Sequence, residues 1–198
     1  MTDKPVFRSP LAAKSPGGTP QMREIAGQTL VLARGVWEDE QFKTALQKAA
    51  GCAPPSSFNT AETAADGGRI VFRLGPDEWL VRDAKTPPEK ICAKFWREFR
   101  RDKKSEEPQS ESTHAAVVNV SDYYTVIEIA GDGARDALAA GCPLDLHPRA
   151  FAPGAHAQSR FAAAAVLLYL RDDAPTFEAQ VRRSFAEYVW DYLRAAGA

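Results

Sequence analysis

The sequence has few cysteines, and they lack the spacing that a disulfide framework or a zinc site needs. The three cysteines are Cys52, Cys92 and Cys142. An odd number of widely separated cysteines does not indicate a disulfide framework, and zinc sites usually place pairs of ligands within about four residues of each other. The histidines are equally scattered: His114, His147 and His156. We therefore expect no metal ion on this chain and expect the cysteines to be small buried apolar groups.

An excess of positive charge and a long apolar run are also missing. The 25 Lys and Arg residues are balanced by 26 Asp and Glu, for a net charge of −1, whereas nucleic-acid-binding domains usually carry a clear basic excess. The longest apolar run, residues 161–170, is half of the roughly 20 residues that span a bilayer. The opening MTDKPVFRSP lacks the apolar core of a signal peptide. These features predict a cytoplasmic protein that binds neither nucleic acid nor membranes.

The phosphate-binding motifs of nucleotide enzymes are incomplete. Gly131-Asp132-Gly133 lies between an expected strand and an expected helix, which is where helix amides can bind a phosphate. The dinucleotide fingerprint needs a further glycine at position 136, where Asp136 stands. Its carboxylate, with that of Asp132, would repel phosphate. A strand-to-helix turn capped by Asp132 is the favoured interpretation.

No catalytic constellation can be assembled from the remaining residues. There is no Gly-x-Ser-x-Gly elbow and no Walker loop. Ser184 stands where it would cap a helix, and no residue is positioned as its base. Asp77 and Glu78 are neighbours on an expected strand edge, so their side chains would point to opposite faces. We predict no catalytic and no cofactor-binding residues.

Apolar periodicity predicts a mixed α+β protein. In the first half, strands are expected at 29–33, 70–74 and 78–82, with helices at 38–50 and 86–101. In the second half, strands are expected at 116–120, 125–129, two within 158–171, and 176–182, with helices at 132–140 and from 184 onward. The pattern indicates two pseudo-repeated strand-helix-strand-strand-helix halves around a largely antiparallel sheet. Gly51 and Gly141 are expected to cap helices, and Thr86 and Ser184 to begin capping boxes.

Two polar segments divide the chain. Residues 1–27 hold four prolines and predict a flexible N-terminal arm. Residues 102–114 are charged, rich in serine and almost without apolar groups, which predicts an exposed loop. The remainder, 28–198, is interpreted as a single α+β domain whose halves, 28–101 and 115–198, are joined by that loop.

The most unusual segment is CPLDLHPRAF, residues 142–151. It has two prolines and neither helical nor strand periodicity, yet it carries large apolar side chains. Such a loop either packs on its own domain or docks on another chain. Trp96 and Trp190 lie off the main apolar lines of their helices, and tryptophans there are either interface anchors or a second buried layer. The sequence leaves both pairs of alternatives open.

Four stretches resemble one protein family in particular. They are RSPLA (8–12), LGPDEWLV (74–81), GARDALAAGCPLDLHPRAFAPGAHAQSRFA (133–162) and RSFAEYVWDYL (183–193). They lie in order along most of the chain, and the sequence is similar to the gamma subunit of heterotetrameric bacterial sarcosine oxidase. The resemblance weakens over 53–68, in the loop from residue 102, and at Tyr123-Tyr124.

The resemblance implies a fold similar to the N-terminal part of the glycine-cleavage aminomethyltransferase and a non-catalytic role beside alpha, beta and delta subunits. That complex oxidatively demethylates sarcosine to glycine, produces hydrogen peroxide and can pass the one-carbon unit to tetrahydrofolate. It implies that FAD, FMN, NAD, zinc and tetrahydrofolate are held by other subunits. Docking, chiefly on the folate-binding alpha subunit, is expected through the following residues: Arg8, Pro10, Leu11, Trp96, Leu144, Leu146, His147, Arg149, Phe151 and Trp190.

Two other functions remain open. A fold of this kind also suits a stand-alone module that binds tetrahydrofolate or transfers one-carbon units, although likeness of fold is a weak guide to function. A small-ligand regulatory domain is the third possibility.

Overall fold

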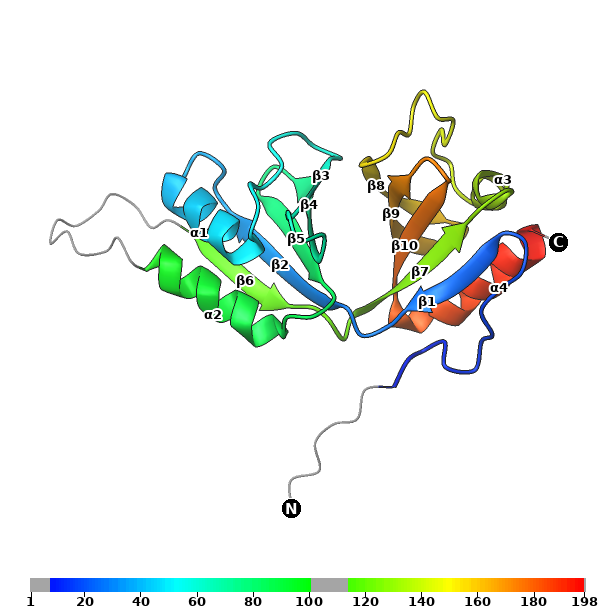
Figure 1. The fold of residues 1–198 in the computed structure, drawn as a ribbon, viewed down its shortest axis with the longest axis horizontal. Coiled ribbons are helices and arrows are strands. Elements are labelled where there is room, and N and C mark those ends of the chain that lie inside the picture. Colours follow the sequence, from blue (N-terminus) through cyan, green and yellow to red (C-terminus); the bar gives the residue numbers. More distant parts are fainter. Residues whose placement is uncertain (1–7, 101–113, 198) are drawn as a thin grey trace, which may run out of the picture. The chain divides into compact units, whose positions relative to one another are not determined.

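The computed structural model describes residues 8–100 and 114–197 (Figure 1). The mixed α+β architecture with antiparallel strands is confirmed, but the strands form two five-stranded sheets in place of one. Each sheet belongs to a separate compact unit. The central unit is Gln28–Ser121, and the terminal unit combines the chain up to Gly27 with the chain from Asp122 onward.

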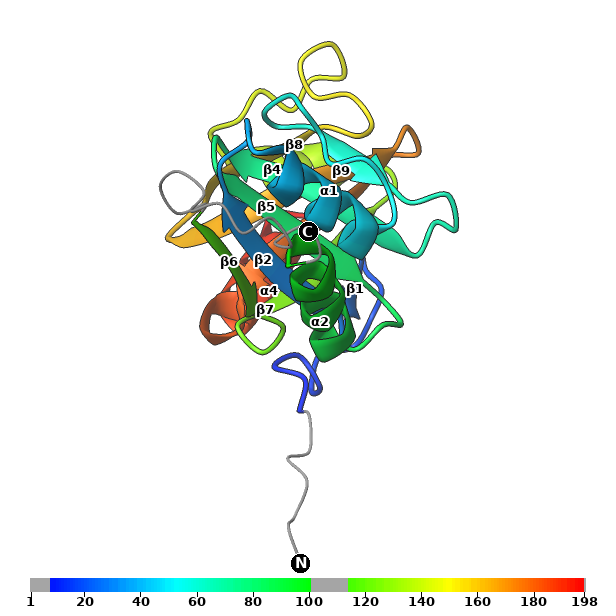
Figure 2. The same cartoon turned by 90° about the vertical axis from the view of Figure 1, so that its left-hand side faces the viewer.

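The central unit is one sheet with two helices on one face. Its strands, in spatial order, are β3 (Ala61–Thr63), β4 (Arg69–Gly75), β5 (Glu78–Asp83), β2 (Thr29–Gly35) and β6 (Ala115–Asn119). The helices are α1 (Glu40–Ala50) and α2 (Pro88–Phe99), which lie side by side against the sheet in both views (Figures 1 and 2). The helices bury the apolar stripes that the spacing predicts, with Phe42, Leu46 and Phe95 all 1% exposed or less.

The terminal unit likewise combines a five-stranded sheet with two helices, one of them short. Its strands, in spatial order, are β1 (Gln21–Ile25), β7 (Tyr124–Ala130), β10 (Thr176–Arg182), β9 (Ala164–Asp172) and β8 (His156–Phe161). Its helices are α3 (Ala134–Ala139) and α4 (Ala186–Ala196), the latter preceded by a 3₁₀ turn at Arg183–Phe185. The alternation predicted for 176–182 is confirmed, because Phe177, Ala179 and Val181 enter the core of this unit.

The expected boundaries between arm, halves and loop are wrong in their described parts. The described part of the arm, residues 8–27, is anchored: β1 pairs with β7, Met22 is 2% exposed and Leu11 is 3% exposed. Strand β6, expected in the second half, pairs with β2 of the first. Sequence patterns predict a strand but do not identify which sheet edge offers it backbone partners. Most of the expected loop 102–114 lies outside the described residues.

The helix caps differ from expectation at four places. Gly51 has the predicted left-handed conformation, with φ of 81°, but Gly141 does not cap α3; a Cβ there would lie 2.8 Å from the Phe161 ring. Helix α3 begins after Gly133, not at a capping Asp132. The hydroxyl of Thr86 accepts a hydrogen bond from Arg69 at 2.9 Å instead of capping α2. Ser184 lies inside the 3₁₀ turn and makes no side-chain cap.

Helix α4 buries only part of the stripe that its spacing predicts, which is Phe185, Tyr188, Val189, Tyr192, Leu193 and Ala196 with Trp190 outside it. In the structure Trp190 is 3% exposed and belongs to the core, whereas Phe185, Tyr188 and Tyr192 are 38%, 42% and 36% exposed. The buried row is Ala186, Val189, Trp190 and Leu193. This row also has helical spacing, and it is the row that is buried because its side chains fill the core of the terminal unit.

Candidate functional site

An ion-pair network crosses the sheet of the terminal unit. The Glu128 carboxylate on β7 accepts hydrogen bonds from the Arg23 Nε on β1 at 2.5 Å and from the Arg171 Nη1 on β9 at 2.8 Å. The Arg171 Nη1 also lies 3.3 Å from the Glu178 carboxylate on β10, and the Arg171 Nε lies 3.3 Å from the Asp172 carboxylate. The strand register places Glu128 directly opposite both Arg23 and Glu178. The network therefore joins β1, β7, β9 and β10, and each carboxylate in it lies next to a guanidinium group.

The network holds Glu128 in its ionised form. The hydrogen bond from Arg23 lowers the pKa of the Glu128 carboxyl below its ordinary 4.5, burial opposes this, and Arg171 adds to the lowering. A carboxyl held ionised between two guanidinium groups is a poor proton donor near neutral pH. We therefore interpret these residues as a structural clamp.

A pH dependence of stability follows from this clamp. A carboxyl with a lowered pKa in the folded state stabilises the protein above its ordinary pKa, and that contribution is lost as the pH falls through the folded-state pKa. Glu128→Gln should therefore lower the Tm at pH 7, and its difference from the wild type should shrink below about pH 4.5. Thermal unfolding followed by circular dichroism between pH 7 and pH 3 measures this.

The matched control is Glu187→Gln, because Glu187 is an exposed carboxylate of the same unit. It should leave the pH profile of Tm unchanged. A Glu128→Gln profile parallel to that of the wild type at every pH would contradict the assignment.

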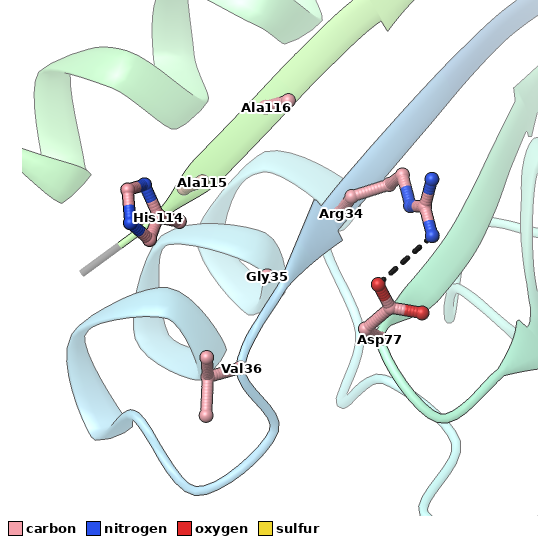
Figure 3. Close-up of a pocket in the computed structure, with 7 residues that line it drawn as sticks. All are labelled: Arg34, Gly35, Val36, Asp77, His114, Ala115 and Ala116. Atoms are coloured by element: carbon pink, nitrogen blue, oxygen red, sulfur yellow. Dashed lines mark hydrogen bonds and ion pairs between the residues drawn. The ribbon is translucent and has the colours of Figure 1, made fainter. Parts of the chain in front are cut away.

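A hollow of about 350 Å³ opens in the central unit (Figure 3). It is lined by the end of β2, the turn between β4 and β5, and the start of β6: Arg34, Gly35, Val36, Asp77, His114, Ala115 and Ala116. The Arg34 Nη2 lies 2.9 Å from the Asp77 carboxylate, and both side chains are more than half exposed, so the pair contributes little stability. The His114 ring lies apart from this pair (Figure 3). The hollow thus offers no nucleophile next to a base.

A groove of about 420 Å³ lies on the terminal unit. It is lined by the end of α3, the segment after it, the hairpin between β8 and β9, and α4: Ala139, Ala140, Gly141, Cys142, Pro143, Arg160, Ala162 and Tyr192. Arg160 is the one charged group in this lining, and its Nη2 donates to the Ala162 carbonyl at 3.2 Å. The Tyr192 hydroxyl donates to the Ala140 carbonyl at 3.4 Å. The groove is suited to apolar contacts beside a single cation.

The cysteines have the character of inert thiols. Burial raises the pKa of the Cys52 and Cys92 thiols, which keeps them protonated and weakly nucleophilic. Cys142 is 7% exposed and belongs to the core of the terminal unit.

Across 8–100 and 114–197, no three His, Cys, Asp or Glu side chains gather as metal ligands would. Within the same ranges, no helix is long and apolar enough to cross a membrane.

Four of the ten expected docking residues are core residues, which corrects that part of the prediction. Leu11, Leu146, Phe151 and Trp190 are between 3% and 6% exposed. The Leu146 carbonyl accepts a hydrogen bond from Arg135, and the Phe151 ring stacks on that of Phe177 with centroids 6.2 Å apart. Of the two alternatives for the loop, packing on its own unit is the one observed.

The other six expected docking residues have varied surroundings. Leu144 and Trp96 are half-buried against the core of their own units, and Trp96 contacts Phe95 and Phe99 edge to face. Arg8, His147 and Arg149 are exposed, and Pro10 is half-buried. Docking through these remains a prediction. Sequence reasoning did not single out Arg160, Tyr188 or Tyr192, although the row Ala186, Val189, Trp190 and Leu193 was a signal that the tyrosines lie outside.

Comparison with known sequences indicates one family. A family model described as "Sarcosine oxidase, gamma subunit family" matches residues 34–198. Sarcosine oxidase subunit gamma of Corynebacterium sp. (strain P-1) is 31% identical over 186 residues, which cover 92% of this chain and 82% of that protein. The protein of the same name from Arthrobacter sp is 31% identical over 144 residues, covering 71% of this chain and 62% of that protein.

Comparison with solved structures points to the same kind of protein. A chain of the heterotetrameric sarcosine oxidase from Corynebacterium sp. U-96, solved with pyrrole 2-carboxylate, superposes with a TM-score of 0.78 at 26% identity and covers 96% of this chain and 94% of that chain. The glycine cleavage system aminomethyltransferase T from Bartonella henselae has a TM-score of 0.59 at 11% identity and covers 87% of this chain and 44% of that chain. The second likeness shows a shared fold.

Proposed function

The chain belongs to the sarcosine oxidase gamma subunit family, and from this we propose that it is the gamma subunit of a heterotetrameric sarcosine oxidase. The observation that carries the proposal is the superposition, over 96% of this chain, on a chain of such an enzyme. The complex would demethylate sarcosine oxidatively to glycine, with release of hydrogen peroxide and transfer of the one-carbon unit to tetrahydrofolate. This chain would support assembly with the folate-binding alpha subunit and take no part in the chemistry.

The local chemistry is consistent with that role. The strongest polar cluster, around Glu128, is occupied with its own ion pairs, and the Arg34–Asp77 pair is exposed. We propose that FAD, FMN, NAD, zinc and tetrahydrofolate are held by the alpha, beta and delta subunits, and that the complex is cytoplasmic.

Native mass spectrometry of the tagged chain purified from its own host tests the proposal. We expect large chains with bound flavin and a small zinc-bearing chain to co-purify with it. A bare monomer or homodimer, with the partner subunits expressed, would contradict the assignment. Calorimetry with a reduced folate would then test the stand-alone folate module, and heat of binding to the isolated chain would favour that alternative.

A further inference from the structure

An aromatic row is exposed along α4 and the end of the 3₁₀ turn before it, in the terminal unit. Phe185, Tyr188 and Tyr192 are 38%, 42% and 36% exposed. Their spacing places them on one side of the helix, over about 10 Å of its length. Exposed aromatic side chains in such a row are typical of the centre of a protein–protein interface.

The row continues into the groove beside the end of α3. Tyr192 belongs to both, since it lines the groove and its ring contacts that of Phe161 with centroids 5.1 Å apart. The Tyr188 hydroxyl accepts a hydrogen bond from the Ala163 amide at 3.4 Å, which ties the row to the hairpin between β8 and β9. We call the row and the groove together the α4 surface. Its length and its mixture of flat aromatic and hollow parts suit a polypeptide segment better than a small ligand.

The groove of the α4 surface carries one charged side chain, that of Arg160. Arg160, on β8, is exposed, and no carboxylate of the described residues forms an ion pair with it. Its hydrogen bond to the Ala162 carbonyl leaves most of its five N–H donors available. By contrast, the exposed Asp191 of α4 is already paired with Lys14 at 2.7 Å. An available guanidinium at the edge of apolar surface matches a carboxylate on the occupant.

We propose that the α4 surface docks a segment of a partner subunit that inserts an apolar side chain into the groove and presents an Asp or Glu carboxylate to Arg160. This rests on the proposed function, because the partner is a subunit of the same complex. The Asp or Glu would form a charge-assisted pair with the Arg160 guanidinium, and the partner backbone would lie along Tyr188 and Phe185.

The test is a competition between variant and wild-type chains for the same partners. Tagged Arg160→Glu is co-expressed with untagged wild type and with the partner subunits in the native host, and the two forms in the purified complex are counted by intact mass. Tyr188→Glu is tested in the same way. Each variant should be incorporated about tenfold less than the wild type or worse, since loss of one interface anchor has at least that effect.

Two controls separate docking from folding. Lys90→Glu reverses an exposed charge on α2 of the central unit and should be incorporated like the wild type. Arg160→Lys keeps the positive charge and should recover most of the incorporation. The thermal unfolding of the isolated Arg160→Glu and Tyr188→Glu chains should match that of the wild type, and hydrogen exchange of residues 185–193 should slow on assembly.

The outcomes distinguish the two proposals. If the wild type assembles and either variant competes equally with it, the docking proposal is overturned and the proposed function stands. A wild-type chain that captures no partner subunit overturns both. A wild-type homodimer that Arg160→Glu dissociates would assign the α4 surface to a second copy of this chain, and would overturn the partner proposed here.

Discussion

Leu146→Asp should unfold the terminal unit. The Leu146 side chain is 5% exposed and belongs to the core cluster that also holds Phe151 and Phe177. Truncating a buried leucine alone costs about 2–5 kcal/mol, and a carboxylate in its place adds the cost of burying an unpaired polar group. We expect a loss of more than about 4 kcal/mol, which is a large share of the roughly 5–15 kcal/mol that stabilises an ordinary domain. Urea unfolding followed by tryptophan fluorescence and circular dichroism measures the change.

The exposed neighbour Ala150 provides the control for this substitution. Ala150→Asp adds the same charge to the same loop and should change the free energy of unfolding by less than about 0.5 kcal/mol. From the sequence, Leu146 was equally acceptable as an interface anchor, in which case Leu146→Asp would weaken assembly and leave the isolated chain folded. An unchanged urea midpoint would restore that interpretation and refute the packing described for 142–151.

Phe42→Ala should strongly destabilise the central unit. The Phe42 ring is fully buried, and its centroid lies 5.3 Å from that of Trp79 and 5.7 Å from that of Phe95. Removing such a ring costs about 3–5 kcal/mol because the cavity collapses only partly. Urea unfolding followed by tryptophan fluorescence and circular dichroism measures the loss. Thr44→Ala, at an exposed position of the same helix, should have little effect.

A double-mutant cycle sharpens this second prediction. The Phe42 ring lies so close to Gly35 that a Cβ at that position would overlap it. Gly35→Ala should therefore destabilise the wild type by about 1–3 kcal/mol through overpacking, and much less once Phe42→Ala has made room. The coupling between the two sites is the specific result. If Gly35→Ala lowered the free energy of unfolding equally in the wild type and in Phe42→Ala, the Phe42 ring would not be in close contact with Gly35.

The role proposed for the chain depends on surface, not on a reactive centre. The ionised groups that the structure brings together are paired with each other, as around Glu128. The surface proposed to dock a partner is made of the aromatic row of α4 and the Arg160 guanidinium. The proposed role is to hold partner subunits, so assembly is the property to measure.

Local sequence alone determined the elements whose partners lie a few residues away. The spacing of Phe42, Ala45, Leu46 and Ala49 predicted helix α1 and its buried face, and Gly51 predicted its end. The turn at 75–77 predicted the β4–β5 hairpin, and alternation predicted β10. Each of these depends on the period of the backbone or on one turn, and both can be recognised in a short window of sequence.

Only the tertiary structure decided which surfaces those elements bury. Strand β1 pairs with β7 about 100 residues further along, and β6 joins β2 of the other half. Trp190 faces the core while Tyr188 and Tyr192 face outward, and the loop with Leu146 packs on its own unit. Apolar spacing shows that a side chain favours burial, but not against which surface. That choice depends on long-range packing and backbone pairing, which no short window of sequence contains.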